Sequence, residues 1–189
     1  MDKRILIICG KSASGKDTLL NRVVDELGYK RIISTTTRPK RDGEVDGVDY
    51  HFVTEEEFKR KINNGEMLEF RAYKVLEDGK DTIWYYGTEK ISVGDDHWVG
   101  VLDISGAKAW RNVYKDQVAV MMLTCPDDIR TDRAKKRGSF SELEWNRRLK
   151  ADTEDFEAQK WVNVVDTVQR NVRDNDLNYA IESVEELMG

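Results

Sequence analysis

The sequence predicts an α/β protein: a parallel sheet flanked by helices, with a mainly antiparallel lobe inserted into it. Apolar runs alternate with helical segments near both ends of the chain, as in parallel sheets whose strands are joined by helices. Between them, residues 34–92 hold Thr, Tyr, Phe and Trp in short alternating runs with Asp-Gly turn signals, which favour antiparallel strands. We therefore expect a core made of 1–33 and 93–189, and a lobe over 34–92 that is an insertion rather than an independent domain.

The first elements are expected to be a strand, a loop, a helix and a second strand. Ile5–Cys9 is an unbroken apolar run that ends at a glycine, which is typical of a buried strand. Lys16–Leu27 carries apolar residues at spacings of three and four, so they share one face of a helix. Arg31–Ile33 is expected to be a short strand.

One helix and a long hairpin are expected inside the lobe. Thr54 and Glu57 form a capping-box pattern, which predicts a helix over Thr54–Asn63. Glu77-Asp78-Gly79-Lys80 is a favourable hairpin turn, and Arg71–Trp84 is expected to form the hairpin around it.

After His97 the pattern of alternating strands and helices returns. The expected strands are Trp98–Ile104, Val118–Thr124 and Asn163–Val168. The expected helices are Gly106–Tyr114, Pro126–Lys136, Ser141–Trp161 and Asp176–Met188.

Composition excludes several classes of protein. The 31 basic and 36 acidic residues among 189 give a net charge of −5, which argues against a general nucleic-acid binder. No apolar run near the start approaches the roughly 20 residues of a membrane span, and Met-Asp-Lys-Arg followed by apolar residues does not form a secretory signal. The two cysteines, Cys9 and Cys125, and the two histidines have no metal-site spacing. We expect a cytoplasmic protein, monomeric or homodimeric, without a zinc site.

The strongest chemical signal is a phosphate-binding loop, or P-loop, between the first strand and the first helix. Its sequence is Gly10-Lys11-Ser12-Ala13-Ser14-Gly15-Lys16. Glycines let the backbone wrap closely around phosphate oxygens, and successive N–H groups and the helix N-terminus then face the anion. Lys16 would neutralise charge on the β- and γ-phosphates. Asp17 stands where Ser or Thr normally supplies a hydroxyl to Mg²⁺, although Thr18 keeps a hydroxyl nearby.

A second anion-binding segment is expected about 20 residues further on. Arg38 and Arg41 flank Pro39, and a bend after the proline could bring both guanidinium groups onto one phosphate. On this segment alone, a solvated basic turn is the alternative.

At this point the chain resembles the guanylate kinases, which convert GMP and ATP to GDP and ADP. The matching stretches are Ser34–Phe58, Gly65–Phe70, Tyr85–Thr88 and, more loosely, Arg133–Gly138 and Arg147–Leu149. The resemblance implies a GMP-binding lobe, and a lid around 133–148 whose arginines close over the ATP phosphates and exclude water.

The resemblance also implies a role for each matching residue. Those expected to act in catalysis are Lys16, Arg41, Arg137 and Arg148. Those expected to bind ATP are Gly10, Ser12, Ala13, Ser14, Gly15, Lys16, Asp17, Thr18, Arg133 and Arg137. Those expected to bind GMP are Ser34, Arg38, Arg41, Tyr50, Glu69, Tyr86, Thr88, Asp103 and Ser105. Asp17 and Asp103 are the expected Mg²⁺ ligands.

Three features depart from the family pattern. The second acid that usually follows Asp103 and helps to read the guanine amino group is Ser105 here, which accepts a hydrogen bond but brings no charge. The link between Glu69 and Tyr86 is longer than usual, and the segment from Thr88 to Trp98 is too short for the helix usual there.

We therefore expect an Mg²⁺- and ATP-dependent guanylate kinase that acts on GMP and dGMP by direct in-line transfer. Two alternatives stay open. One is a kinase of the same fold with another phosphorylated acceptor, which Ser105 favours and Glu69 opposes. The other is a non-catalytic guanylate-kinase-like interaction module, which the intact loop opposes.

Overall fold

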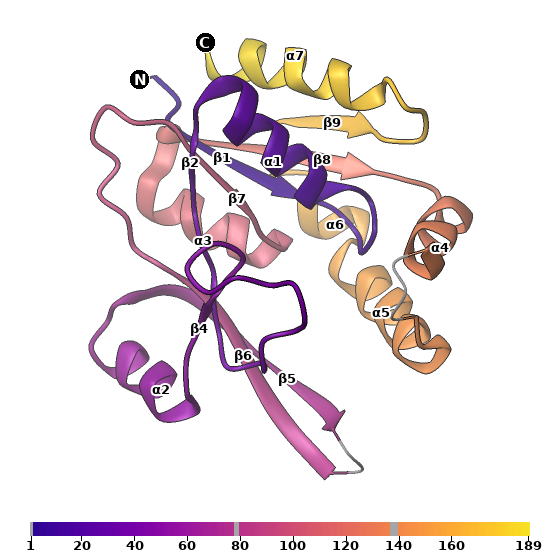
Figure 1. The fold of residues 1–189 in the computed structure, drawn as a ribbon. Coiled ribbons are helices and arrows are strands. Elements are labelled where there is room, and N and C mark those ends of the chain that lie inside the picture. Colours follow the sequence, from indigo (N-terminus) through magenta and orange to yellow (C-terminus); the bar gives the residue numbers. More distant parts are fainter. Residues whose placement is uncertain (1, 78–79, 137–139) are drawn as a thin grey trace. The chain divides into compact units, whose positions relative to one another are not determined.

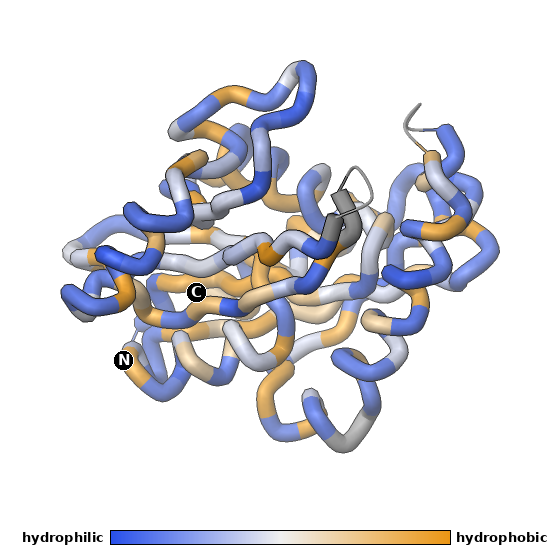
Figure 2. Tube along the Cα trace, turned by 90° about the horizontal axis from the view of Figure 1, so that it is seen from below, coloured by the Kyte–Doolittle hydropathy of each residue, from blue (hydrophilic) through white to orange (hydrophobic). Residues whose placement is uncertain are grey.

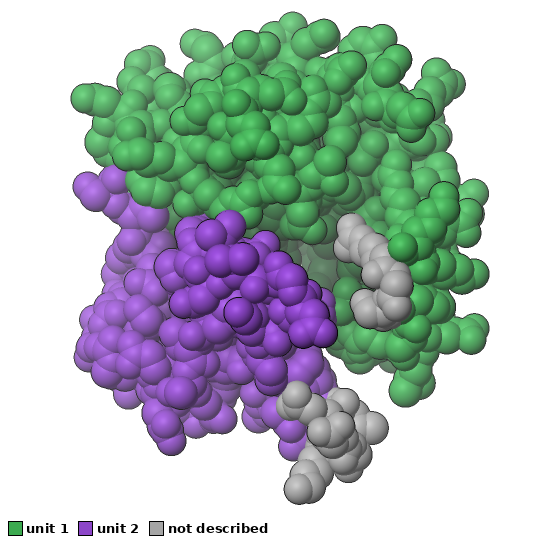
Figure 3. All heavy atoms as spheres, in the orientation of Figure 1, with its two compact units in different colours: residues 1–31, 93–189 green, residues 32–92 purple. Residues whose placement is uncertain are grey.

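The computed structural model describes residues 2–77, 80–136 and 140–189, and the chain divides into two units (Figure 1 and Figure 3). Unit 1 contains Met1–Arg31 and Val93–Gly189, and unit 2 contains Ile32–Ser92. Each unit has its own sheet, so each is described by itself.

Unit 1 is a five-stranded parallel sheet flanked by helices. Its strands are β1 (Ile5–Cys9), β2 (Lys30–Arg31), β7 (Trp98–Val101), β8 (Val118–Thr124) and β9 (Thr167–Arg170), in the order β2-β7-β1-β8-β9. Its helices are α1 (Lys16–Leu27), α3 (Ile104–Tyr114), the short 3₁₀ helix η1 (Lys115–Gln117), α4 (Asp127–Lys136), α5 (Glu142–Asp155), α6 (Ala158–Trp161) and α7 (Asp176–Met188).

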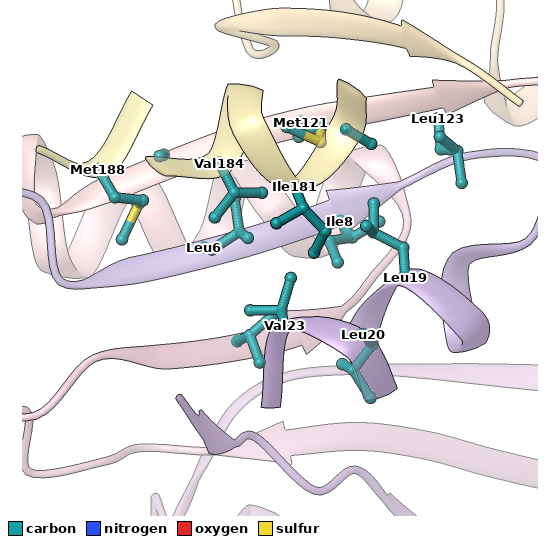
Figure 4. Close-up of a cluster of buried hydrophobic side chains, with 13 residues drawn as sticks. Leu6, Ile8, Leu19, Leu20, Val23, Met121, Leu123, Ile181, Val184 and Met188 are labelled. Carbon is teal, nitrogen blue, oxygen red and sulfur yellow. The ribbon is translucent and has the colours of Figure 1, made fainter. Parts of the chain in front are cut away.

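The central strands β1 and β8 are buried on both faces, as their unbroken apolar runs predict. On one face, side chains of β1 and β8 pack against α1 and α7 (Figure 4). The labelled members of this cluster are Leu6, Ile8, Leu19, Leu20, Val23, Met121, Leu123, Ile181, Val184 and Met188. The opposite face of β1 carries Ile5, Ile7 and Cys9, and α3 contacts β1 and β8. In Figure 2 the apolar colour follows these central strands.

Unit 2 holds a mixed, mainly antiparallel sheet. Its strands are β3 (Thr35–Thr36), β4 (His51–Phe52), β5 (Met67–Glu77) and β6 (Lys80–Glu89), in the order β4-β3-β6-β5. Only the β3–β4 pair is parallel. The helix α2 (Glu55–Asn63) begins where the capping pattern predicts, because Thr54 Oγ1 accepts a hydrogen bond from the Glu57 N–H at 3.1 Å.

The fold class is confirmed, and so are the bounds predicted for β1, α1, β8 and α7. The longer hairpin is also present, since β5 and β6 pair up to Glu77 and Lys80, but its turn at Asp78-Gly79 lies outside the described residues. Between 90 and 97 the described chain contains no helix, as expected.

Other bounds were predicted wrongly near the start of α3. The strand expected over Trp98–Ile104 ends at Val101, and α3 begins at Ile104 rather than Gly106. The reason is the Asp103 carboxylate, whose Oδ1 accepts the Gly106 N–H at 2.7 Å and caps the helix. The expected strand Arg31–Ile33 is Lys30–Arg31, because only these two residues pair with β7.

The bounds after Pro126 also differ. The helix expected from Pro126 begins at Asp127, and the long helix expected over Ser141–Trp161 is broken at Phe156 into α5 and α6. The strand expected over Asn163–Val168 is shifted to Thr167–Arg170. Backbone hydrogen bonds to Trp161 O hold 164 and 165 in a turn, so the ladder with β8 starts later.

None of the helices in the described part of the chain has the length and apolar character that crossing a membrane requires.

Candidate active site

The backbone of the phosphate-binding loop requires glycine at two positions. Gly10 has φ of +155° and Gly15 has φ of +100°, both uncommon for residues with a side chain. A Cβ at Gly10 would lie 2.4 Å from the Leu123 carbonyl oxygen, and one at Gly15 would lie 2.2 Å from Asn171 Nδ2. Ala13 has φ of +59°, so the crest of the loop holds a non-glycine residue in the left-handed region.

The loop opens directly into α1, whose N-cap is Gly15. A helix that starts on glycine leaves its first N–H groups and its positive dipole end facing the loop. Lys16 is the first residue of this helix, and its Nζ donates to Lys11 O at 3.0 Å, across the loop. The Ser14 side chain is 1% exposed, and its Oγ has no hydrogen-bond partner in the described part of the chain. These features fit an anion with several oxygens.

Asp17 and Asp103 both follow strands that are neighbours in the sheet. Asp17 lies in the exposed first turn of α1 beside Thr18, and Asp103 lies two residues after β7. Because β1 and β7 are parallel partners, the two carboxylates lie at the same end of the sheet. Oxygen donors of this kind fit Mg²⁺, which keeps several waters and uses few protein ligands. Within the described ranges, no group of three or more His, Cys, Asp or Glu residues could hold a metal.

A buried ion pair between Arg130 and Asp152 contacts the loop at Ser12, and it was not predicted from the sequence. Arg130 of α4 is fully buried, and its Nη1 donates to Asp152 Oδ2 and to Ser12 O, both at 2.8 Å. Asp152 of α5 accepts the Ser12 N–H at 3.0 Å and the Ser12 hydroxyl at 3.2 Å. No sequence motif marks Arg130 or Asp152 as residues that contact the loop.

Of the three expected lid arginines, two lie in the described ranges. Arg133 Nη1 donates to Asn171 O at 3.1 Å and lies 3.5 Å from Ser14 O, so its guanidinium contacts the loop. Arg148 donates from Nε to Glu144 Oε1 at 2.9 Å. Arg137 lies outside the described residues.

In unit 2 the Glu44 carboxylate contacts the side chain of Arg38 and the backbone of Arg41, the two arginines of the second anion segment. Arg38 is 4% exposed and donates from Nη2 to Glu44 Oε1 at 2.7 Å, while Glu44 Oε2 accepts the Arg41 N–H at 2.8 Å. Burial raises the pKa of the Glu44 carboxyl, but the hydrogen bonds from Arg38 and Arg41 outweigh it, and the pKa lies below its ordinary value. No sequence motif marks Glu44, although it lies three residues after Arg41.

Two expected tyrosines gather around Arg38. The Arg38 guanidinium lies over the Tyr50 ring at 5.4 Å, and the Tyr50 and Tyr86 ring centroids are 6.2 Å apart. Arg41 lies three residues after Arg38 in the sequence, and it is exposed. Unit 2 therefore contains a cationic group with phenol rings around it.

A row of polar side chains crosses three strands of the same sheet. Thr88 of β6 is fully buried and donates from Oγ1 to Glu69 Oε1 at 2.8 Å, from β6 to β5. Thr35 of β3 pairs with Gly87 of β6, and Ser34 directly precedes β3. Two of the predicted base-reading residues, Glu69 and Thr88, are thus cross-strand neighbours.

The remaining two residues expected to bind GMP belong to unit 1. Asp103 caps α3, and Ser105 is exposed in the first turn of that helix. The expected GMP-binding set is therefore divided between the units.

Comparison with known proteins places the chain in a family. The guanylate kinase family profile matches residues 2–189. A guanylate kinase from Symbiobacterium thermophilum is 33% identical over 183 residues, covering 94% of this chain and 80% of that protein. One from Caldanaerobacter subterraneus subsp. tengcongensis is 34% identical over 187 residues, with 95% and 84% covered. The crystal structure of guanylate kinase from Anaplasma phagocytophilum shares the fold, with a TM-score of 0.63 at 22% identity, over 100% of this chain and 88% of that one. The matched profile and the two relatives show that this chain belongs to the guanylate kinase family.

Proposed function

We propose that the protein transfers the γ-phosphoryl group of ATP to GMP, and to dGMP, giving the nucleoside diphosphate and ADP. The observation that carries this proposal is the intact phosphate-binding loop, with Gly10, Gly15 and Lys16 in strand–loop–helix context, in a chain of the guanylate kinase family. The buried, unpartnered Ser14 hydroxyl supports it, since a buried polar group in a native protein normally has a partner.

The acceptor would bind to unit 2, the lobe, with its phosphate on the arginine–tyrosine group. Arg38 is ordered by Glu44, so its guanidinium needs little rearrangement to meet a phosphate, and Arg41, Tyr50 and Tyr86 would complete the clamp. The guanine edge would meet Glu69, Thr88 and Ser34. A carboxylate such as Glu69 accepts hydrogen bonds from N1–H and the 2-amino group, a pair that guanine alone presents among the common bases.

The donor triphosphate would bind to the loop in unit 1, with residues 10–18 around its phosphates. Mg²⁺ bound with ATP would neutralise charge on the β- and γ-oxygens, and Asp17 and Asp103 are the residues that would hold it. Lys16 would contact the same oxygens. Arg133, which contacts the loop in this structure, and Arg137 and Arg148 would stabilise charge on the transferred group.

The chemistry needs neither a covalent intermediate nor a strong general base, because the acceptor phosphate oxygen is already anionic. The protein therefore acts by positioning two nucleotides in line and by supplying cations where negative charge is shared. Closure over both substrates would exclude the water that otherwise hydrolyses ATP.

A second acceptor is favoured by one observation. Ser105 replaces the acid that the family places two residues after Asp103, and a neutral hydroxyl reads the guanine amino group less strictly than a carboxylate. Another nucleoside monophosphate is therefore the alternative substrate.

The test is a coupled assay of ADP release with Mg²⁺ and ATP against GMP, dGMP, AMP, CMP, UMP and dTMP. We expect turnover with GMP and dGMP only, and we expect Lys16→Ala to lower kcat by about 100-fold or more, the usual effect of losing a transition-state charge contact. Turnover with another base would support the alternative acceptor. No turnover with any of the six would refute the proposal.

A further inference from the structure

We infer that Arg130 and Asp152 form a clamp that sets the conformation of the phosphate-binding loop and ties it to α4 and α5. They would be positioning residues for the bound triphosphate and would not touch it. The inference rests on the proposed function only in taking the loop's ligand to be Mg²⁺ and a nucleoside triphosphate.

The clamp holds a single residue of the loop from both sides. The Ser12 N–H and hydroxyl donate to the two oxygens of Asp152, at 3.0 and 3.2 Å, and the Ser12 carbonyl accepts from Arg130 Nη1 at 2.8 Å. Arg130 Nη1 also bonds Asp152 Oδ2 at 2.8 Å, which closes the ring of contacts. Both peptide groups of Ser12 therefore have a fixed orientation.

The next residue needs such support. Ala13 has φ of +59°, a conformation that a residue with a Cβ keeps only when its surroundings impose it. Ser12 precedes it directly, so the clamp holds one side of this turn, which a hydrogen bond from the Ser14 N–H to Lys11 O at 3.2 Å closes. The N–H groups that follow Ala13 are those that face the phosphates in a loop of this type.

Packing alone does not explain why an ion pair is buried at this position. Arg130 is fully buried and Asp152 is 8% exposed, and buried ion pairs of this kind are often no more stable than apolar residues of similar volume. Apolar residues could not form hydrogen bonds with the N–H, hydroxyl and carbonyl groups of Ser12, as this pair does. The pair therefore has a role that shows in nucleotide binding more than in stability.

The charges of the two residues also matter separately. Asp152 brings a carboxylate to the back of a loop that binds anions, and Arg130 neutralises it at 2.8 Å. Removing Arg130 alone would leave that negative charge beside the phosphates, whereas removing both residues would only release the loop. The single variant should therefore bind a triphosphate less well than the double variant.

The experiment compares Arg130→Met, Asp152→Asn and the double variant Arg130→Met/Asp152→Leu with the parent protein. Three quantities are measured: the melting temperature, the Kd for Mg²⁺·ATP by calorimetry, and hydrogen exchange of the Ser12 amide. Asp127→Asn is the matched control, because Asp127 accepts from the same Arg130 guanidinium at 2.7 Å, whereas the Ser12 hydrogen bonds described above go to Arg130 and Asp152.

We expect the double variant to melt close to the parent, yet to bind Mg²⁺·ATP about ten-fold or more weakly, with faster exchange at Ser12. Arg130→Met should bind more weakly still. Asp152→Asn keeps an acceptor oxygen, so its Kd should rise by only about three-fold. Asp127→Asn should leave the Kd and the Ser12 exchange unchanged.

A double variant that binds Mg²⁺·ATP as tightly as the parent, with unchanged exchange at Ser12, would show that the pair is structural only. If the double variant does not fold, unchanged Kd and exchange in folded Asp152→Asn would overturn the inference equally. Failure of the proposed function has a different signature: a parent protein that does not turn over GMP still reports the clamp through Mg²⁺·ATP binding, and exchange at Ser12 reports it without any nucleotide.

Discussion

Under the proposed function, Glu69 is the residue on which the choice of base would depend. Its Oε1 accepts from the buried Thr88 hydroxyl at 2.8 Å, and this hydrogen bond fixes the carboxylate without consuming its capacity to accept others. A register shift between Met67 and Glu69 interrupts the ladder at this point. Such irregularities re-aim side chains and are common beside functional sites.

Glu69→Gln should lower kcat/KM for GMP by about 100-fold or more. The NH₂ group of the new amide is a hydrogen-bond donor, and it would lie opposite the N1–H or the 2-amino group of guanine, which are donors too. The KM for ATP should stay within about two-fold, since the loop and its contacts lie in unit 1. Steady-state kinetics with each substrate varied in turn measure both effects.

Glu66→Gln is the control for this substitution. Glu66 precedes the same strand, but its carboxylate pairs with Arg60 and Lys61 on α2. Its removal should leave the kinetics unchanged. A Glu69→Gln enzyme within about three-fold of the parent in kcat/KM for GMP would show that Glu69 does not read the base.

Single residues also mark the limit of what the sequence could predict. Gly10, Gly15 and Lys16 were found because their chemistry depends on neighbours in the chain. Arg130 and Asp152 were missed because their partner Ser12 lies 118 and 140 residues away along the sequence. No local pattern records a contact of that length.

The helices also differ in how well the sequence predicts their bounds. α1 has the bounds predicted for it, because Gly15 and Gly28 in left-handed conformations limit it at both ends. The helix predicted over Ser141–Trp161 is broken, because the backbone at Phe156 leaves the helical region. The prediction was too long because the apolar pattern continues through this residue. Tertiary packing decides such breaks, and the sequence carries no proline or glycine there to announce one.

Helix α5 contains a charge cluster with a definite pH dependence. Glu144 accepts from Arg147 Nε at 2.7 Å and from Arg148 Nε at 2.9 Å. The hydrogen bond from Arg147 lowers the pKa of the Glu144 carboxyl most; burial raises it, the bond from Arg148 lowers it further, and the result is a pKa of about 2 instead of 4.5. Because the folded pKa is lowered, the stabilisation is complete above about pH 4.5 and is lost as pH falls toward about 2.

Glu144→Gln should therefore lower the free energy of unfolding at pH 7 by at most about 1 kcal/mol, a small amount because the side chain is 42% exposed and solvent screens the pair. The difference from the parent should shrink between pH 4.5 and pH 3. Urea denaturation at pH 7, 4.5 and 3 measures it. Glu142→Gln, an acid in the same first turn, controls for the helix dipole. A difference that stays constant with pH would contradict this account.

At the scale of the whole molecule, the phosphate-binding loop belongs to the unit that contains the main apolar core. The apolar core cluster whose residues run from Leu6 to Met188 belongs to unit 1 and joins α1 and α7 to the sheet (Figure 4). The phosphate-binding loop emerges from β1 and enters α1, two elements of this cluster. The loop is therefore joined at both ends to elements of this apolar core.

Ile181→Ala tests how far the loop depends on that packing. Ile181 lies in α7, is 7% exposed and belongs to the apolar cluster. Its truncation should lower the free energy of unfolding by about 2–5 kcal/mol, because it leaves a cavity. The melting temperature should fall by several degrees, while Mg²⁺·ATP at about 100 times its Kd should add about 2.7 kcal/mol to parent and variant alike. Differential scanning fluorimetry with and without Mg²⁺·ATP measures both. Equal ligand shifts would mean that the loop's conformation is set locally, by its glycines and the Arg130–Asp152 pair; a much smaller shift in the variant would mean that the loop depends on the core as a whole.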